Sequence, residues 1–348
     1  MKIDVFPHIL PSKFLKAFLA RSPKSFRKSI WYKILGVLPT LSDLDHRFRI
    51  MDRYEGLTQV LTLASPPIET VLEPNDAIEL ARIANDEMAE LVVKYPDRFV
   101  AAVACLPMND IDAAVDELDR AITELGLKGI QLFTSINGKP LDSEEFMPFY
   151  AKMANYDLPI WIHPRRDRPG PDYSTERESK YLISSLFGRE YETAAAMTRL
   201  VFAGVLEKYP ELKLITHHFG GMVSFLEKRI EGLYDWHEER LGYKYTQNLT
   251  ERPINYYRKF YCDTAYGSAA GLTCAHVFFG PDHMLFATDM PYDSELGNRK
   301  IRETIRSIEQ MDIADHEKKK IFEENARRLL HLNIQAGSTA AGQGSEIS

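Results

Sequence analysis

Short apolar runs alternate along the chain with longer segments whose apolar residues recur every three or four positions. Runs with the length of buried strands lie at residues 3–6, 57–63, 99–105, 129–133, 158–163, 212–216, 260–264 and 283–287. Segments with the period of an amphipathic helix lie at residues 76–95, 110–125, 143–155, 190–209, 222–239, 298–311 and 316–332. Eight strands separated mostly by helices predict an α/β fold, a (β/α)8 TIM barrel.

Two long segments interrupt this alternation. Residues 12–50, rich in Lys, Arg and aromatic residues, are predicted to form helical insertions, and residues 165–190 form a second insertion after the fifth strand. Both are placed to cover the rim of the barrel. We expect residues 1–334 to form one domain, and residues 335–348, rich in Gly, Ser, Ala and Gln, to be a disordered tail.

Polar residues follow several of the predicted strands at the point where each strand ends. His8 follows the first strand, His163 closes the fifth, and Asp289 follows the eighth. Because a barrel brings the carboxyl ends of its parallel strands to one rim, these side chains should meet. Neutral imidazoles and carboxylates are common ligands of zinc and manganese. We therefore predict a divalent metal ion, Zn or Mn, held by His8, His163 and Asp289.

Two histidines follow the sixth strand. Adjacent strand residues point to opposite sides, so His217 and His218 are not expected to face the rim together. We assign His218 to the site, as a fourth ligand or as a general acid and base, and His217 to packing or to the support of a ligand. Asp289 can ligate the metal and also carry a proton, so His218 and Asp289 are the predicted catalytic residues.

Three arginines, Arg165, Arg166 and Arg168, follow His163 closely. They could clamp a carboxylate substrate through bidentate hydrogen bonds, or they could form a solvated loop. We expect at least one of them to enter the site, and Arg165 is the candidate for substrate binding. Asp263, after the seventh strand, is either a functional group at the rim or a carboxylate that caps a loop.

Three stretches of the chain resemble a known family. They read Leu-Pro-Ile-Trp-Ile-His-Pro at residues 158–164, His-His-Phe-Gly-Gly-Met at 217–222 and Phe-Ala-Thr-Asp-Met-Pro at 286–291. In their order and spacing the chain resembles the amidohydrolase superfamily, in the branch of aminocarboxymuconate-semialdehyde decarboxylase and related aromatic acid decarboxylases. The resemblance extends to about residue 332 and implies a barrel of the metal-dependent hydrolase type.

The resemblance also implies roles for single residues. His163 and Asp289 match metal ligands of the family, and His218 matches a histidine beside the metal-bound water or substrate. Arg229 matches an arginine that in some members binds a substrate carboxylate across a dimer interface, so a homodimer or homotetramer is implied. Lys128 begins the fourth strand rather than ending it, so the resemblance implies one metal ion without a bridging lysine.

The first strand departs from the family pattern. The family opens with Asp-x-His-x-His, or with Glu in place of the first His, whereas residues 3–8 read Ile-Asp-Val-Phe-Pro-His. His8 matches the second ligand, but Phe6 stands in the first position, and phenylalanine cannot ligate a metal. The site therefore works with the remaining ligands, binds metal weakly, or has lost its metal chemistry.

Composition narrows the choice of partner and compartment. The net charge of −7, from 43 basic and 50 acidic residues without a basic stripe, argues against a nucleic-acid partner. No apolar run approaches the roughly 20 residues that span a bilayer, so no membrane partner is expected. The three cysteines, Cys105, Cys262 and Cys274, are scattered and odd in number, which favours a cytoplasmic protein.

The candidate ligands, together with the resemblance to the decarboxylase branch, imply a metal-dependent, non-oxidative decarboxylase of an aromatic or unsaturated carboxylic acid, expected to be hydroxylated. The metal would chelate the carboxylate and a neighbouring oxygen, Asp289 or His218 would protonate the ring carbon, and CO2 would leave. Because the same ligands serve both reactions, a metal-dependent hydrolase of a lactone or an amide is the alternative. Phe6 adds a third hypothesis, a barrel that binds a small acid without turning it over.

Overall fold

The computed structural model describes residues 1–166 and 171–333. The tail at 335–348, predicted to be disordered, and Arg168 lie outside these described residues. No helix in the described ranges is long and apolar enough to cross a lipid bilayer.

Eight parallel strands form a closed barrel. β1 (Lys2–Asp4), β3 (Leu57–Leu63) and β4 (Phe99–Ala102) pair in one sheet, and β5 (Ile130–Phe133), β8 (Ile160–His163), β9 (Leu214–Thr216), β10 (Tyr261–Asp263) and β11 (Met284–Leu285) pair in another. Backbone contacts join the two sheets at both edges. Ala104 forms a parallel bridge with Ile130, and the Val5 amide donates to the Phe286 carbonyl at 3.0 Å. The predicted (β/α)8 barrel is confirmed.

Most strands are shorter than the apolar runs that predict them. β3 has the predicted bounds, whereas the eighth run, at 283–287, is paired only over Met284–Leu285. Phe286 and Ala287 stay fully buried beyond the end of the pairing. An apolar run in the sequence indicates that its residues are buried. In this barrel the residues stay buried beyond the last hydrogen bond between the strands.

The helices between and after the strands are α4 (Pro74–Lys94), α5 (Ile111–Thr123), α6 (Met147–Asn155), α7 (Arg189–Phe202), α8 (Val205–Lys208), α9 (Glu227–Leu241), α10 (Pro253–Tyr257), α11 (Ala269–Phe279), α12 (Asn298–Glu309), α13 (Asp315–Lys319) and α14 (Asn325–Leu329). The predicted helix at 190–209 is split into α7 and α8 at Gly204, whose φ of 74° is left-handed. The sequence pattern does not predict α11, because its residues are apolar on nearly every side and give no helical period.

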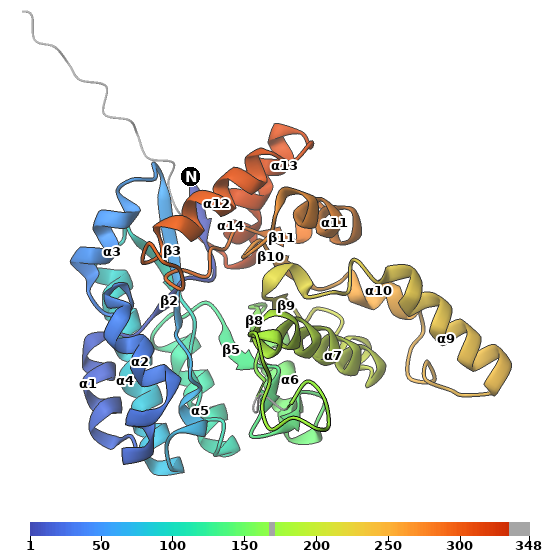
Figure 1. The fold of residues 1–348 in the computed structure, drawn as a ribbon, viewed down its shortest axis with the longest axis horizontal. Coiled ribbons are helices and arrows are strands. Elements are labelled where there is room, and N and C mark those ends of the chain that lie inside the picture. Colours follow the sequence, from blue (N-terminus) through green and yellow to red (C-terminus); the bar gives the residue numbers. More distant parts are fainter. Residues whose placement is uncertain (167–170, 334–348) are drawn as a thin grey trace, which may run out of the picture.

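Residues 12–50 form the predicted helical insertion, which consists mainly of α1 (Ser12–Arg21), α2 (Ile30–Val37) and α3 (Leu44–Met51). Figure 1 shows these helices, in blue, beside α4 on one side of the molecule. Glu87 of α4 accepts hydrogen bonds from the backbone amides of Lys13 and Phe14, at 3.0 and 2.9 Å. These bonds satisfy free amides in the first turn of α1 and fix the insertion to the barrel.

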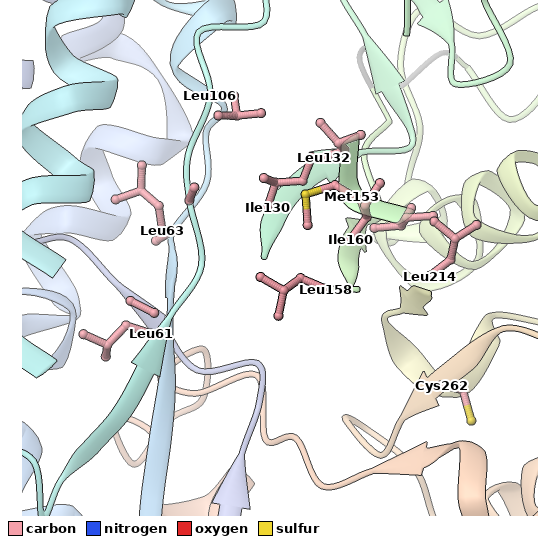
Figure 2. Close-up of a cluster of buried hydrophobic side chains, with 14 of the residues drawn as sticks. Leu61, Leu63, Leu106, Ile130, Leu132, Met153, Leu158, Ile160, Leu214 and Cys262 are labelled. Carbon is pink, nitrogen blue, oxygen red and sulfur yellow. The ribbon is translucent and has the colours of Figure 1, made fainter. Parts of the chain in front are cut away.

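Alternate strand residues pack on the two sides of the barrel wall. Ile160 of β8 and Leu214 of β9 belong to the buried cluster between strands and helices, part of which Figure 2 shows. Their neighbours Trp161 and Ile215 belong to a second buried cluster, and Trp161 Nε1 donates to the Val5 carbonyl at 2.9 Å. The residue two positions after Trp161 and the residue two positions after Ile215 therefore point to the same side of the barrel wall as these two.

Replacing Asn85 of α4 should destabilise the barrel. Its buried side chain donates to the Cys105 carbonyl (2.9 Å) and to Glu117 (2.7 Å), and it accepts from the Cys105 amide (2.8 Å). Asn85→Ala leaves these groups unsatisfied, so we expect the free energy of unfolding in urea to fall by about 2–4 kcal/mol. Asn75→Ala, at an exposed position of the same helix, is the control. A loss below about 0.5 kcal/mol for Asn85→Ala would contradict the prediction.

Candidate active site and metal centre

Histidines and a carboxylate from distant parts of the chain meet at the carboxyl ends of the strands. The ligand atoms of His8, His163 and His217 lie within 4.8 Å of one another, and so do those of His217, His218 and Asp289. His8 lies in β2 (His8–Ile9), which extends the first strand, and His163 ends β8. The structure therefore brings together the predicted ligands and both predicted catalytic residues, with His217 among them.

The expectation that His217 and His218 cannot face the site together is wrong. Strand β9 ends at Thr216, but His217 keeps an extended backbone (φ −76°, ψ 159°), so the alternation of side chains continues through His217 and stops there. His217 continues the side of Ile215, while His218 turns back into the cluster with a left-handed φ of 54°. The two imidazoles stack with centroids 4.1 Å apart. The sequence does hold a signal for His217, since it follows Ile215 by two positions as His163 follows Trp161.

The carboxylate of Asp289 lies at the centre of this cluster. Its Oδ1 lies 3.0 Å from His8 Nε2 and 3.2 Å from His217 Nε2, and its Oδ2 accepts from Lys300 Nζ at 2.5 Å. Burial raises the pKa of Asp289, but the Lys300 ammonium and the histidine hydrogen bonds outweigh it and hold that pKa well below its usual range. Asp289 is therefore a carboxylate ion, which is the form that binds cations.

Lys300 is a buried residue of the site that sequence reasoning misses. It lies in the first turn of α12, and its ammonium sits 3.1 Å from the ring centroid of Tyr266. An ammonium over an aromatic face is a favourable contact, more so when it is removed from water. Nothing in the local sequence distinguishes Lys300 from the basic residues around it.

The Nδ1 atoms of the three clustered histidines each have a partner. His163 Nδ1 lies 2.9 Å from the Pro164 carbonyl, and His217 Nδ1 is tightly bonded to the buried Asp263. His8 Nδ1 lies 3.4 Å from Thr62 Oγ1. When Nδ1 carries the proton in this way, the lone pair of the neutral ring lies on Nε2, which is the tautomer that ligates metals.

Burial and charge act differently on the three imidazoles. Burial lowers the pKa of His8, and burial together with the neighbouring His8 and His217 holds the pKa of His163 well below its usual value. Burial also disfavours charge on His217, but the carboxylates of Asp263 and Asp289 raise its pKa to about 9. Without a metal ion, His217 therefore keeps the proton on Nε2. A metal ion that binds Nε2 would displace that proton.

His218 differs from the other histidines. Its Nδ1 bonds Glu190 at 2.8 Å, and its buried Nε2 has no hydrogen-bond partner among residues 1–166 and 171–333. His218, Asp289 and Tyr266 line one pocket, and each has a left-handed φ, between 54° and 61°. Backbone strain of this kind in non-glycine residues is typical of functional sites, where it fixes a side chain in one direction.

The residues present fit a divalent metal ion. Neutral imidazoles at His8 and His163, a third imidazole at His217 and the carboxylate of Asp289 form a donor set typical of zinc or manganese sites. The unpartnered Nε2 of His218 adds a polar atom beside this set. Phe6 contributes no donor, as its side chain predicts.

The pocket beside the cluster has aromatic and cationic walls. Trp31 and Ile34 of α2, with Phe133 at the end of β5, form apolar walls, so the insertion at 12–50 does cover the rim. Arg165, the predicted substrate-binding residue, lines this pocket as expected. Arg189, the first residue of α7, also lines it, and sequence reasoning misses it because no motif marks that position.

Arg229 does not reach the pocket within one chain. It is exposed on α9, the helix that projects away from the barrel in Figure 1. A role for Arg229 in substrate binding would therefore require a second copy of the chain. That role stays a prediction.

Three comparisons link the chain to known proteins. The sequence model of a family described as Amidohydrolase matches residues 30–332. A γ-resorcylate decarboxylase of Polaromonas sp. is 31% identical over 301 residues, covering 83% of this chain and 87% of the relative. A 2-amino-3-carboxymuconate-6-semialdehyde decarboxylase of Dictyostelium discoideum is 29% identical, covering 96% and 92%. The crystal structure of a dihydroxybenzoic acid decarboxylase from Polaromonas sp. JS666, with bound manganese and the inhibitor 2-nitroresorcinol, matches with a TM-score of 0.77 at 28% identity, covering 96% of this chain and 97% of that one.

Lys300→Met should destabilise the metal-free protein, because it leaves the buried charge of Asp289 without its ammonium. We expect the free energy of unfolding, measured in urea with a chelator, to fall by roughly 3 kcal/mol. Adding Asp289→Asn should recover part of the loss, since it removes the uncompensated charge. Arg299→Met, which breaks the exposed pair with Glu303 on the same helix, is the matched control and should cost less than about 1 kcal/mol. Equal losses of the free energy of unfolding in Lys300→Met and Arg299→Met would contradict this prediction.

Proposed function

Because this chain belongs to the amidohydrolase family, in its decarboxylase branch, we propose that it releases CO2 from an aromatic carboxylic acid, without oxidation and with one divalent metal ion. Membership of this branch makes the chain an enzyme of the carboxy-lyase class, as the sequence motifs predict. A single pocket combines donors that fit a metal ion, arginines that fit a carboxylate and aromatic walls that fit a ring. This combination is the observation that supports the proposal most directly.

The proposed substrate is a benzoic acid that carries a hydroxyl group next to its carboxylate. Arg165 and Arg189 lie at the two ends of the 165–190 insertion, line the same pocket and would pair with the carboxylate. Trp31, Phe133 and Tyr292 offer flat surfaces for an aromatic ring. The γ-resorcylate and dihydroxybenzoic acid decarboxylases act, by name, on hydroxylated rings, which supports the hydroxyl group.

His8, His163 and Asp289 would hold the metal ion. When bound, the ion would neutralise charge on the oxygens of an acidic substrate and so favour binding and reaction. The donor set suits zinc or manganese, and the manganese in the Polaromonas structure makes manganese the first ion to test. Lys300 would hold the second oxygen of Asp289 and so keep that carboxylate in one orientation.

His218 is the proposed proton donor. Glu190 bonds its Nδ1, while no group in the described part of the chain bonds the buried Nε2 of this pocket-lining residue. Transfer of the Nε2 proton forms a C–H bond at the ring carbon that bears the carboxylate. The bond to the carboxylate then breaks, its electron pair returns to the ring and CO2 leaves. Asp289 is the poorer donor because, against the effect of burial, Lys300 and His217 hold its pKa well below the usual range.

We also propose that the protein works as a homodimer or homotetramer in the cytoplasm. Arg229 supports an oligomer, since on exposed α9 it is placed to contact another chain. Cys105, Cys262 and Cys274 are all free thiols, which supports a reducing compartment.

The direct experiment is an assay of CO2 release from hydroxybenzoic acids by the purified protein loaded with manganese or zinc. Decarboxylation of an acid with a hydroxyl next to the carboxylate, abolished by a chelator, supports the proposal. Hydrolysis of lactones or amides without any decarboxylation would instead support the alternative function, a metal-dependent hydrolase. Tight binding of acids without any turnover would identify a binding protein.

The kinetic constants should separate the two kinds of pocket residue. Arg165→Gln and Arg189→Gln remove charged hydrogen bonds to the substrate, so we expect KM to rise about 10–100-fold with a smaller change in kcat. His218→Asn removes the proton donor, so we expect kcat to fall about 10²–10⁴-fold. Arg53→Gln, an exposed arginine before the amino end of β3, is the control. A fall in kcat alone for the arginine variants would contradict their binding role.

Mixed oligomers test Arg229. If Arg229 completes the pocket of a neighbouring chain, Arg229→Gln and His218→Asn should each be poorly active alone. Co-expression of the two variants should then restore part of the activity, because some pockets receive both an intact His218 and an intact Arg229. The same mixture should stay inactive if Arg229 serves its own chain.

A further inference from the structure

Phe6 lies in the middle of the histidine cluster. Its ring is fully buried, stacks on His217 with centroids 4.0 Å apart, and lies 5.6 Å from the His8 ring and 5.8 Å from the His163 ring. A donor atom at this position would be within reach of the same centre as those imidazoles. The phenyl ring supplies none, so the first strand gives the site one ligand, His8, instead of two.

His217 offers a donor at this place. Its imidazole stacks directly on Phe6, and one of its ring nitrogens lies within 4.8 Å of ligand atoms of His8 and His163. Its Nε2 lies 3.2 Å from Asp289 Oδ1. His217 and Asp263 are both fully buried, and Asp263 holds Nδ1 of the ring. A carboxylate that fixes the far nitrogen of a histidine is the usual support of a metal-ligating imidazole.

Asp289 also brings the two imidazole nitrogens to one point. His8 Nε2 and His217 Nε2 approach the same carboxylate oxygen, at 3.0 and 3.2 Å. These contacts are hydrogen bonds when the nitrogens carry protons. A metal ion bound here would use the same lone pairs in place of those protons.

We propose that His217 Nε2 is a metal ligand of this chain and replaces the donor that Phe6 cannot provide. Asp263 is then a positioning residue that holds the His217 ring. The inference rests on the proposed function, because it assigns a ligand to the metal ion proposed there. The ligand set becomes His8, His163, His217 and Asp289, and His218 remains free for proton transfer.

The test measures metal affinity, which needs no substrate. Chelator-treated protein is titrated with Co²⁺ and with Mn²⁺, followed by calorimetry, and by the visible spectrum in the case of Co²⁺. His217→Ala should weaken binding by more than about 100-fold and change the Co²⁺ spectrum, whereas Asp263→Asn should weaken it roughly 10–100-fold. His316→Ala, at an exposed site on α13, is the matched control and should leave affinity unchanged.

A rescue variant separates ligation from packing. Phe6→His or Phe6→Glu, combined with His217→Ala, returns a donor to the first strand and should restore most of the lost affinity. A purely structural role of His217 predicts no rescue. His217→Gln serves as a second variant in which a polar side chain can still bond Asp263, and circular dichroism of the metal-free proteins checks that each variant is folded.

The outcomes distinguish this inference from the proposed function. A wild-type chain that binds metal, with affinity unchanged in His217→Ala and His217→Gln, would overturn the role of His217 and leave the metal-dependent decarboxylase in place. A wild-type chain that takes up neither ion would overturn both, and the Lys300 ammonium would then be the cation that serves Asp289. Loss of affinity with rescue at position 6 supports the replacement.

Discussion

The buried charge of Asp289 is the constraint on which the site depends. A carboxylate removed from water costs several kcal/mol unless cations and hydrogen bonds surround it. Lys300 from α12 bonds one oxygen, and His8 and His217 from two other strand ends approach the second. The closed barrel, with its strand ends at one rim and α12 beside them, brings these separate segments to a single side chain, so the fold and the site are stabilised together.

Residues at the ends of regular strands could be predicted from sequence, because the signal is local. His163 and Asp289 each follow a short apolar run, and the barrel rule then places them together. The alternation rule admits only one of the two adjacent histidines, and the prediction favours His218 over His217, but after β9 ends at Thr216 the structure brings both to the site. The left-handed backbone of His218, which has no signature in the sequence, breaks that rule.

Lys300 and Arg189 mark the limit of sequence reasoning. Each lies in the first turn of a helix, among other charged residues and without any motif. Their presence at the site depends on how α12 and α7 pack on the rim, which is a property of the whole fold. The resemblance to the family does not reveal them either, since it supplies ligands and Arg229 but leaves the charged walls of this pocket unassigned.

The fully buried ring of Phe6 also divides the centre into two unequal faces. On the barrel side it presents carbon to the imidazoles, keeps water away and lowers the local dielectric, so that the charges around Asp289 act more strongly on one another. On the other side, the pocket with Arg165 and Arg189 is open and cationic. The centre is therefore accessible from the pocket side, where the proposed acid would meet the arginines, and closed on the side of the barrel interior.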